Sequence, residues 1–171
     1  MTGLPSALLA AALSYSGRGW PVLPLHTVLD ARCSCADTTC AHPGKHPRIR
    51  SGKQHAHAAV DASIIAEWWK RWPTSNVGVV TGARSGLVVL DIDPRHGGLE
   101  SLHDIEEQHG PLPVMPTVIT GSGGLHLYFR HPGGRVPNRV SIFPGIDLRG
   151  DGGLVVCPPS VHVQGSYRWR S

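Results

Sequence analysis

Three segments of the chain place their apolar residues at helical spacing. The predicted helices cover residues 4–16, 62–72 and 99–109. Asp61 precedes the second helix and is a typical N-terminal cap. The third helix is amphipathic, and we expect Leu99, Leu102 and Ile105, or Glu106 beside Ile105, to form its inward side.

Short runs rich in β-branched and apolar residues, bounded by glycine and proline, predict strands between and after these helices. They cover residues 20–25, 77–81, 87–91, 117–120, 125–130, 146–148, 154–157 and 166–169. The 21 glycines and 15 prolines are spread along the chain, which favours short elements and many loops. We therefore predict an α+β fold and not a helical bundle.

Residues 27–57 show no apolar periodicity. A stretch of this length without its own core is unusual in a compact domain, so something other than hydrophobic packing must organise it. The chain of 171 residues is otherwise of a size typical of one domain. We predict a single domain, residues 1–171, with residues 27–57 as an insertion.

The net charge and the length of the apolar runs indicate which partners and which cellular location to expect. The formal net charge of +4 is a mild basic excess, which favours polyanionic partners only weakly. The apolar run from Leu4 to Leu13 is too short to span a bilayer and lacks the pattern of a secretion signal. We expect a cytoplasmic protein that is a monomer as an isolated domain and does not bind membranes.

Two acids end the buried run at residues 87–90. Because strand side chains alternate, Asp91 and Asp93 should project from one face about 7 Å apart while Ile92 turns into the core. Two carboxylates so placed repel each other unless a cation lies between them, and hard oxygen ligands suit divalent metals. The alternative for this pair alone is a solvated strand end or a helix cap before Gly97.

A third acid strengthens the metal interpretation. Asp147 has apolar neighbours on both sides, which marks it as a strand residue, and an acid in mid-strand is costly unless it is solvated or ligated. Asp151 lies in a glycine-rich turn and needs no such role. We therefore select Asp147 as the third ligand.

The segment Gly121-Ser122-Gly123-Gly124 joins two predicted strands. Its glycines would let backbone N–H groups approach an anion, and His126 and Tyr128 follow on one strand face. This combination suits a triphosphate. Taken alone, the turn could be an ordinary hairpin and the histidine a structural residue.

The order of these motifs resembles the bifunctional primase/polymerase domain of the archaeo-eukaryotic primase superfamily. The resemblance rests on Asp-Ile-Asp after an apolar strand, then Gly-Ser-Gly-Gly-X-His-X-Tyr-Phe, then Gly-Ile-Asp-Leu-Arg-Gly-Asp-Gly-Gly and Pro-Pro-Ser. It extends over nearly the whole chain through Gly19-Trp20-Pro21-Val22, Gly44-Lys45-His46-Pro47, Trp68-Trp69 and Asn76-Val77-Gly78-Val79.

The resemblance implies a function and a set of site residues. The family's domains are template-dependent nucleotidyltransferases, that is, DNA primases and DNA polymerases of plasmid, phage or mobile-element replication proteins. They use Mg²⁺ or Mn²⁺ and release pyrophosphate. Asp91, Asp93 and Asp147 would correspond to the metal-binding acids and His126 to the histidine that contacts the nucleotide phosphates, with Ser122 and Gly124 in the same pocket.

The same resemblance implies the architecture and the partners. The family fold is an RRM-like sheet packed with a second α/β unit, and the expected partners are a DNA template and primer with dNTP or NTP. Such domains are commonly followed by a helical segment and a helicase, neither of which we recognise in this chain.

Three of the four cysteines cluster inside residues 27–57. Cys33, Cys35 and Cys40 with one histidine would provide the tetrahedral sulfur and nitrogen ligands of a structural zinc, and the metal would replace the missing core. Free thiols or an oxidisable pair are the alternatives. We prefer His46, in the segment that matches family members, over His42 as the fourth ligand.

Two questions about function stay open at this point. Lys45, Arg48, Arg50, Lys53 and Arg149 could hold template or triphosphate, or could form a solvated face. A zinc-stabilised DNA-binding module without catalysis, and a metal-dependent phosphodiesterase or nuclease that uses the same acids, are the two alternative functions.

Overall fold

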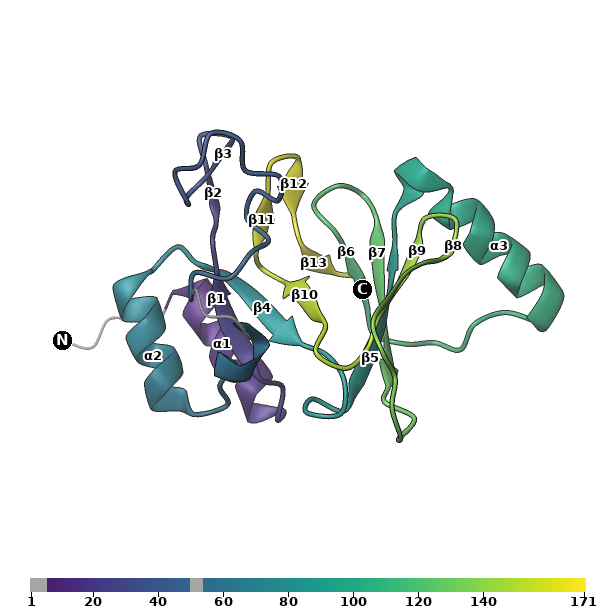
Figure 1. Cartoon of the computed structure of the whole chain (residues 1–171), viewed down its shortest axis with the longest axis horizontal. Helices are drawn as coiled ribbons and strands as arrows, with labels where there is room; N and C mark the ends of the chain where they lie inside the picture. The colour runs from purple at the N-terminus through teal and green to yellow at the C-terminus, as the bar shows by residue number, and fades with distance from the viewer. Residues whose placement is uncertain (1–5, 50–53) are drawn as a thin grey trace.

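In the computed structural model, which describes residues 6–49 and 54–171, helices lie at two ends of the molecule with strands between them (Figure 1). The helices within these residues are α1 (Ala7–Gly17), α2 (Ala62–Arg71) and α3 (Gly98–His109), with 3-10 turns η1 (Gln54–His57) and η2 (Pro94–His96). The three predicted helices are therefore present, although residues 4 and 5 of the first lie outside the described part of the chain. None of the described helices is long and apolar enough to cross a membrane.

The strands form two principal sheets. The three-stranded sheet has the order β1-β4-β10 and comprises β1 (Val22–Leu25), β4 (Asn76–Val80) and β10 (Leu154–Cys157). The six-stranded sheet has the order β13-β6-β7-β5-β9-β8 and comprises β5 (Leu87–Ile92), β6 (Thr117–Ile119), β7 (Leu125–Arg130), β8 (Arg139–Phe143), β9 (Ile146–Arg149) and β13 (Arg168–Trp169). All their pairings are antiparallel. The predicted α+β class is confirmed, whereas the RRM-like assignment and the single-domain division stay predictions.

Helices α1 and α2 pack with the three-stranded sheet at the left of Figure 1. The carboxylate of Asp61 caps α2 by accepting hydrogen bonds from the backbone N–H groups of Ser63 and Ile64. Ile65 and Trp69 of α2 are buried in the core. Every residue of the central strand β4 is buried, which explains its continuous apolar run.

Side chains of β5 alternate between the two faces of the six-stranded sheet, and each face packs in a different hydrophobic core. Leu87 and Val89 join the core of the three-stranded sheet, whereas Ile92 belongs to a second core that packs with α3. We call α1, α2 and the three-stranded sheet the first unit, and the six-stranded sheet with α3 the second. An aromatic stack connects them: Trp20 lies 5.8 Å from Tyr15 of α1 and 6.1 Å from Tyr128 of β7, measured between ring centroids. The face of β5 that carries Leu87 and Val89 therefore lies against the first unit.

Two details of the sequence prediction were wrong. Leu99 is 45% exposed, although Leu102 and Ile105 pack in the second core as expected. The inward side of α3 begins instead at Gly98, where an added Cβ would lie 2.6 Å from the backbone oxygen of Gly145. This close contact turns the helix so that Leu99 points outward.

The second wrong detail concerns the last predicted strand, residues 166–169, which the structure shows as parts of two separate strands. Gly165–Ser166 is β12, in a two-stranded sheet with β11 (Val161–His162), whereas β13 lies in the six-stranded sheet. The buried ring of Tyr167 lies between them, so the chain changes sheets at this residue.

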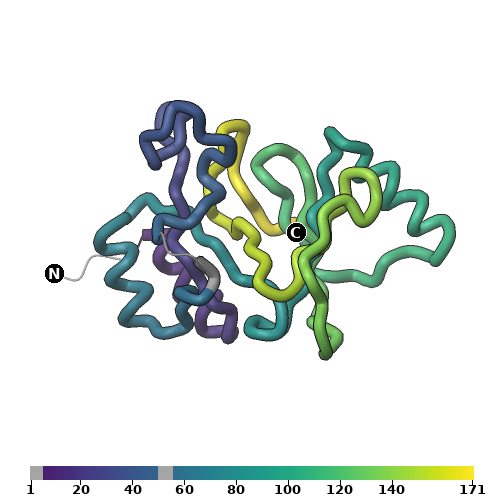
Figure 2. The backbone as a smooth tube through the Cα atoms, viewed as in Figure 1, coloured from purple at the N-terminus to yellow at the C-terminus, as the bar shows by residue number. Residues whose placement is uncertain are grey.

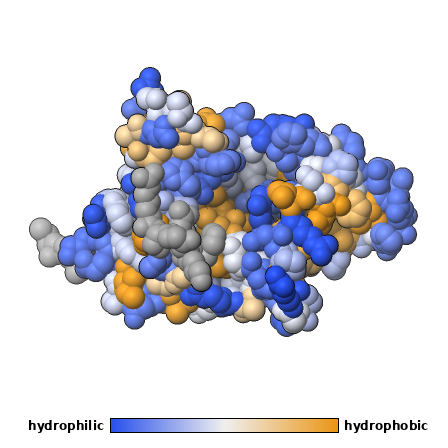
Figure 3. All heavy atoms as spheres, viewed as in Figure 1, coloured by the Kyte–Doolittle hydropathy of each residue, from blue (hydrophilic) through white to orange (hydrophobic). Residues whose placement is uncertain are grey.

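The described part of residues 27–57 has little regular structure. It contains the two-stranded sheet of β2 (Val28–Leu29) and β3 (Arg32–Cys33), and the turn η1. In Figure 2 the blue tube that follows β3 passes beside the yellow tube of β11, and the Asn76 side-chain amide donates to a carbonyl in each segment, those of Gly44 and Val161. Hydrophilic side chains cover much of the face seen in Figure 3, and hydrophobic ones gather between α3 and the six-stranded sheet.

Candidate active site and cysteine–histidine cluster

Three neighbouring strands carry the predicted polar residues side by side. β5 pairs with β7 and β9, and Asp91 is the register partner of His126 on one side and of Asp147 on the other. Residues directly opposite each other project from the same face of a sheet. His126, Asp91 and Asp147 therefore form a row across the face that is turned toward the first unit.

This row opens into a pocket of about 810 Å³. Residues of β10, in the three-stranded sheet, line its other side. All six residues predicted for catalysis or nucleotide binding line the pocket, namely Asp91, Asp93, Ser122, Gly124, His126 and Asp147. The structure thus brings the predicted residues together, and their roles stay proposals.

Arg149 joins two of the acids. Its side chain lies two residues after Asp147 and shares the pocket face, and one guanidinium nitrogen, Nη2, lies 2.9 Å from Asp91 Oδ2 and 2.9 Å from Asp147 Oδ2. The other Asp147 oxygen accepts a hydrogen bond of 2.8 Å from the backbone N–H of Ser141. The single positive charge of the guanidinium therefore offsets part of the negative charge of the two carboxylates.

Asp93 is compatible with both earlier interpretations, a metal ligand and a helix cap before Gly97. It lines the pocket, but it also caps η2 by accepting a hydrogen bond from the backbone N–H of Arg95. The Arg95 guanidinium donates to both of its oxygens at 3.0 and 2.8 Å. Hydrogen bonds from Arg95, and one from His96, hold the pKa of Asp93 well below its usual range. Asp93 is thus an ionised carboxylate at neutral pH, and it lines the pocket.

His126 is almost fully buried at the other end of the row. Burial lowers the pKa of His126 below its usual value, although the nearby Asp91 acts in the opposite direction, so the ring is neutral at pH 7. Its Nε2 lies 3.6 Å from Asp91 Oδ1, and within the described residues its buried Nδ1 has no hydrogen-bond partner.

The glycine turn connects β6 to β7 as predicted, but its amides are arranged differently from our expectation. The backbone N–H of Gly123 donates to the carbonyl of Thr120, and that of Gly124 donates to the Thr120 hydroxyl at 2.9 Å. These two groups are used inside the turn. An anion in the pocket would therefore meet the side chain of Ser122 and not a cradle formed by these glycine amides.

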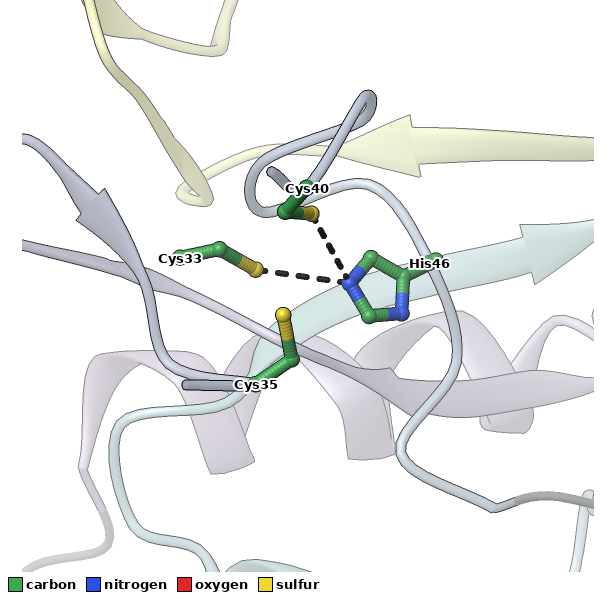
Figure 4. Close-up of side chains that lie close together, drawn as sticks. All are labelled: Cys33, Cys35, Cys40 and His46. Carbon is green, nitrogen blue, oxygen red and sulfur yellow. Dashed lines mark hydrogen bonds between the residues drawn. The ribbon is translucent and has the colours of Figure 1, made fainter. Parts of the chain in front are cut away.

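The cysteine–histidine cluster lies in the segment that lacks a core (Figure 4). One possible ligand atom from each of Cys33, Cys35, Cys40 and His46 lies within 4.8 Å of all the others. His46 Nε2 is 3.3 Å from Cys33 Sγ and 3.5 Å from Cys40 Sγ. Tetrahedral zinc with its usual bond lengths separates sulfur and nitrogen ligands by about 3.6 Å, so these residues could hold zinc.

The structure places His46 in this cluster, as the sequence predicted, whereas His42 is not a member of it; both histidines line the 810 Å³ pocket. Among the described residues no other group of three or more histidine, cysteine or acidic side chains is as tightly gathered. The three pocket acids therefore surround a wider space than the cysteines do. Cys157 is buried in β10, where its sulfur lies 3.3 Å from the Tyr128 hydroxyl.

Comparison with protein families agrees with the resemblance inferred from the motifs. A family model described as bifunctional DNA primase/polymerase, N-terminal, matches residues 12–171. The chain belongs to this family. Membership implies a nucleotidyltransferase of the primase/polymerase type, with DNA and nucleotides as substrates. No curated protein matches the chain.

The primase/polymerase domain has pocket residues that the sequence did not identify. Arg95 and His96 bind Asp93, and Tyr167 places its ring 5.9 Å from that of His126. Arg149 was considered as a ligand of template or triphosphate or as part of a solvated face, although its spacing of two residues from Asp147 in one strand was a usable signal that both face the pocket.

Asp151 has the structural role expected of it. Its carboxylate accepts hydrogen bonds from the backbone N–H groups of Ala83 and Val136 and does not line the pocket. Of the basic residues near the cysteines, Lys45 lines the pocket, whereas Arg48 stacks near Trp72 at 5.8 Å. Arg50 and Lys53 lie outside the described residues.

Proposed function

We propose that this primase/polymerase domain adds nucleotides to a primer on a DNA template, with release of pyrophosphate, as part of a plasmid, phage or mobile-element replication protein. The observation that carries the proposal is the register of β7, β5 and β9, which aligns His126, Asp91 and Asp147 on one wall of a pocket large enough for a nucleotide. Binding of DNA alone would not require two acids to lie side by side on neighbouring strands.

The acids have the chemistry that the family's metals need. Asp91, Asp93 and Asp147 would hold Mg²⁺ or Mn²⁺, because these hard cations take carboxylate oxygens. Two such ions, when bound, neutralise charge on the phosphates and on the attacking and leaving oxygens of a phosphoryl transfer. Arg149 holds Asp91 and Asp147 in this structure, and its guanidinium would be available to contact a phosphate if a metal took its place on these acids.

The remaining pocket residues position the nucleotide. His126 is neutral and can donate one ring N–H to a phosphate oxygen without the cost of a buried charge. Ser122, which carries a hydroxyl, and Gly124, which has no side chain, line the same pocket. We assign the triphosphate to this end and the primer terminus to the acids.

We further propose that Cys33, Cys35, Cys40 and His46 bind one structural zinc, which organises the insertion at residues 27–57. The order β6-β7-β5-β9, with α3 joining β5 to β6, supports an RRM-like unit. The helices α1 and α2 with the three-stranded sheet would be its second α/β unit.

Primer extension tests the proposed function. A labelled primer on a longer template, with dNTPs and either Mg²⁺ or Mn²⁺, should be lengthened with release of pyrophosphate, and EDTA should stop the reaction. Shortening of the labelled strand without pyrophosphate release would favour a nuclease instead. Binding of DNA with no incorporation under either metal would favour the zinc-stabilised binding module.

Arg149 provides a separate prediction about metal affinity. We expect Arg149→Ala to bind Mn²⁺ about tenfold more tightly, because the guanidinium holds Asp91 and Asp147 at 2.9 Å and the variant removes its competition with a cation for these carboxylates. Titration calorimetry or the electron paramagnetic resonance of free Mn²⁺ measures the change. Arg168→Ala, which removes an exposed arginine of β13, is the control. Weaker Mn²⁺ binding by Arg149→Ala would show that the guanidinium supports the metal and does not compete with it.

A further inference from the structure

Lys45 belongs to the cysteine–histidine segment but reaches the other site. It lies between Cys40 and His46, two members of the cluster, yet its side chain lines the pocket that contains the acids. Within the described residues its ammonium group makes no hydrogen bond or ion pair. A half-buried cation without a direct partner is costly unless an anion binds beside it.

The backbone before Lys45 is held in place by buried contacts. Gly44 has a φ of +75°, and a Cβ there would lie 3.0 Å from Val28 Cγ2. The side-chain amide of the fully buried Asn76 donates to the Gly44 carbonyl at 2.9 Å and to the Val161 carbonyl at 2.8 Å. Asn76 lies in β4, so these bonds attach the residue before Lys45 to the three-stranded sheet.

The backbone after Lys45 is held by the cluster. His46 directs its Nε2 toward the sulfurs of Cys33 and Cys40 (Figure 4), and the backbone N–H of His26 donates to the His46 carbonyl at 2.9 Å. The backbone N–H of Gly44 also donates to Cys33 Sγ at 3.5 Å. Lys45 is thus fixed from both sides, and a metal in the cluster would stiffen this support further.

Lys45 differs from the other lysine and arginine side chains of the pocket. Arg95 binds both oxygens of Asp93, and Arg149 binds Asp91 and Asp147, so each is paired with carboxylates. Lys45 is the pocket cation that is not committed in this way among the described residues. A lysine ammonium acts as a compact point charge and is a common ligand of phosphate.

We propose that Lys45 binds the β- or γ-phosphate of the incoming nucleoside triphosphate, and that the cysteine–histidine cluster positions it there. The cluster is then part of the nucleotide site as well as a support for the insertion. This inference rests on the proposed function for the identity of the ligand.

Equilibrium binding of dCTP and dCMP to the purified domain tests the assignment. Ca²⁺ replaces Mg²⁺ so that no incorporation takes place during the measurement. We expect Lys45→Ala to weaken dCTP binding at least tenfold and to change dCMP binding less than twofold, because the monophosphate lacks the groups that Lys45 contacts. Lys45→Arg should retain most of the affinity for dCTP. The matched control is Lys70→Ala, which removes an exposed lysine paired only with Glu67 at 3.5 Å.

Zinc content and thermal midpoint, measured on each variant, should match those of the unaltered domain. Unchanged dCTP binding by Lys45→Ala, or an equal loss for dCTP and dCMP, would overturn the assignment. Failure of the unaltered domain to bind dCTP would overturn it together with the proposed function. Binding that depends on Lys45 in a domain that never extends a primer would uphold the assignment and reject only the polymerase activity.

Discussion

Asp91→Asn should lower the rate of primer extension at least about 1,000-fold, which corresponds to about 4 kcal/mol of lost transition-state stabilisation. Asp91 is central in the row across β7, β5 and β9, with one oxygen near His126 and the other on Arg149. Asparagine keeps the size of the side chain but removes the negative charge that would hold the metal. Steady-state incorporation of a single dNTP measures the loss.

Two other acids provide controls for this experiment. Asp104→Asn alters an exposed acid of α3 and should leave the rate within twofold. Asp151→Asn removes a carboxylate that accepts hydrogen bonds from two backbone N–H groups, so it should lower the thermal midpoint but preserve the rate per folded molecule. Near-normal extension by folded Asp91→Asn would reject the proposed site.

The sequence was most informative where a local rule decides the outcome. Alternation along one strand was enough to place Ile92 in a core and Asp91 on the opposite face, and the structure agrees. The cap at Asp61 and the burial of Cys157 follow from similarly local arguments. The grouping of Cys33, Cys35, Cys40 and His46 could be predicted because a metal site requires particular ligand types within a short segment.

The arrangement of the site depended on contacts between distant residues. Asp91 and Asp147 are 56 positions apart, and only the pairing of β5 with β9 makes them register partners. The sequence pattern of a strand indicates which residues share a face, but it does not indicate which strand lies beside it or in which register. The bridge from Arg149 to both acids was missed for this reason.

The glycine turn and α3 show a second limit. Glycines at residues 121–124 are compatible with an anion cradle. However, the Thr120 hydroxyl and carbonyl accept hydrogen bonds from two of their backbone N–H groups, and a hairpin pattern does not predict that Thr120 would take these donors from an anion. The inward face of α3 similarly depends on the contact of Gly98 with Gly145, at the distant β8–β9 turn. Apolar periodicity alone assigned Leu99 to the wrong side.

Loss of the cluster metal should have the second large effect, on stability. The free energy of zinc binding in small domains is about 10–16 kcal/mol, and much of it is available for folding. The insertion has little regular structure of its own, since β2 and β3 have only two residues each, and the buried ones among its described residues, Thr27, Cys33, Gly44 and Pro47, are small or isolated in the sequence. We expect Cys35→Ser to lower the free energy of unfolding by at least about 3 kcal/mol, or about 6–12 °C in the thermal midpoint.

Elemental analysis and calorimetry together check this prediction. The unaltered domain, purified without added metal, should contain about one zinc per chain, and Cys35→Ser should contain almost none. Cys157→Ala is the control, because this cysteine is buried in β10 and lies outside the cluster, so the zinc content of the variant should not change. A stable, zinc-free unaltered domain would contradict the zinc assignment while leaving the acids untouched. Retention of zinc by Cys35→Ser would instead show that Cys33, Cys40 and His46 suffice, since those three already lie within hydrogen-bonding distance of one another through His46 Nε2.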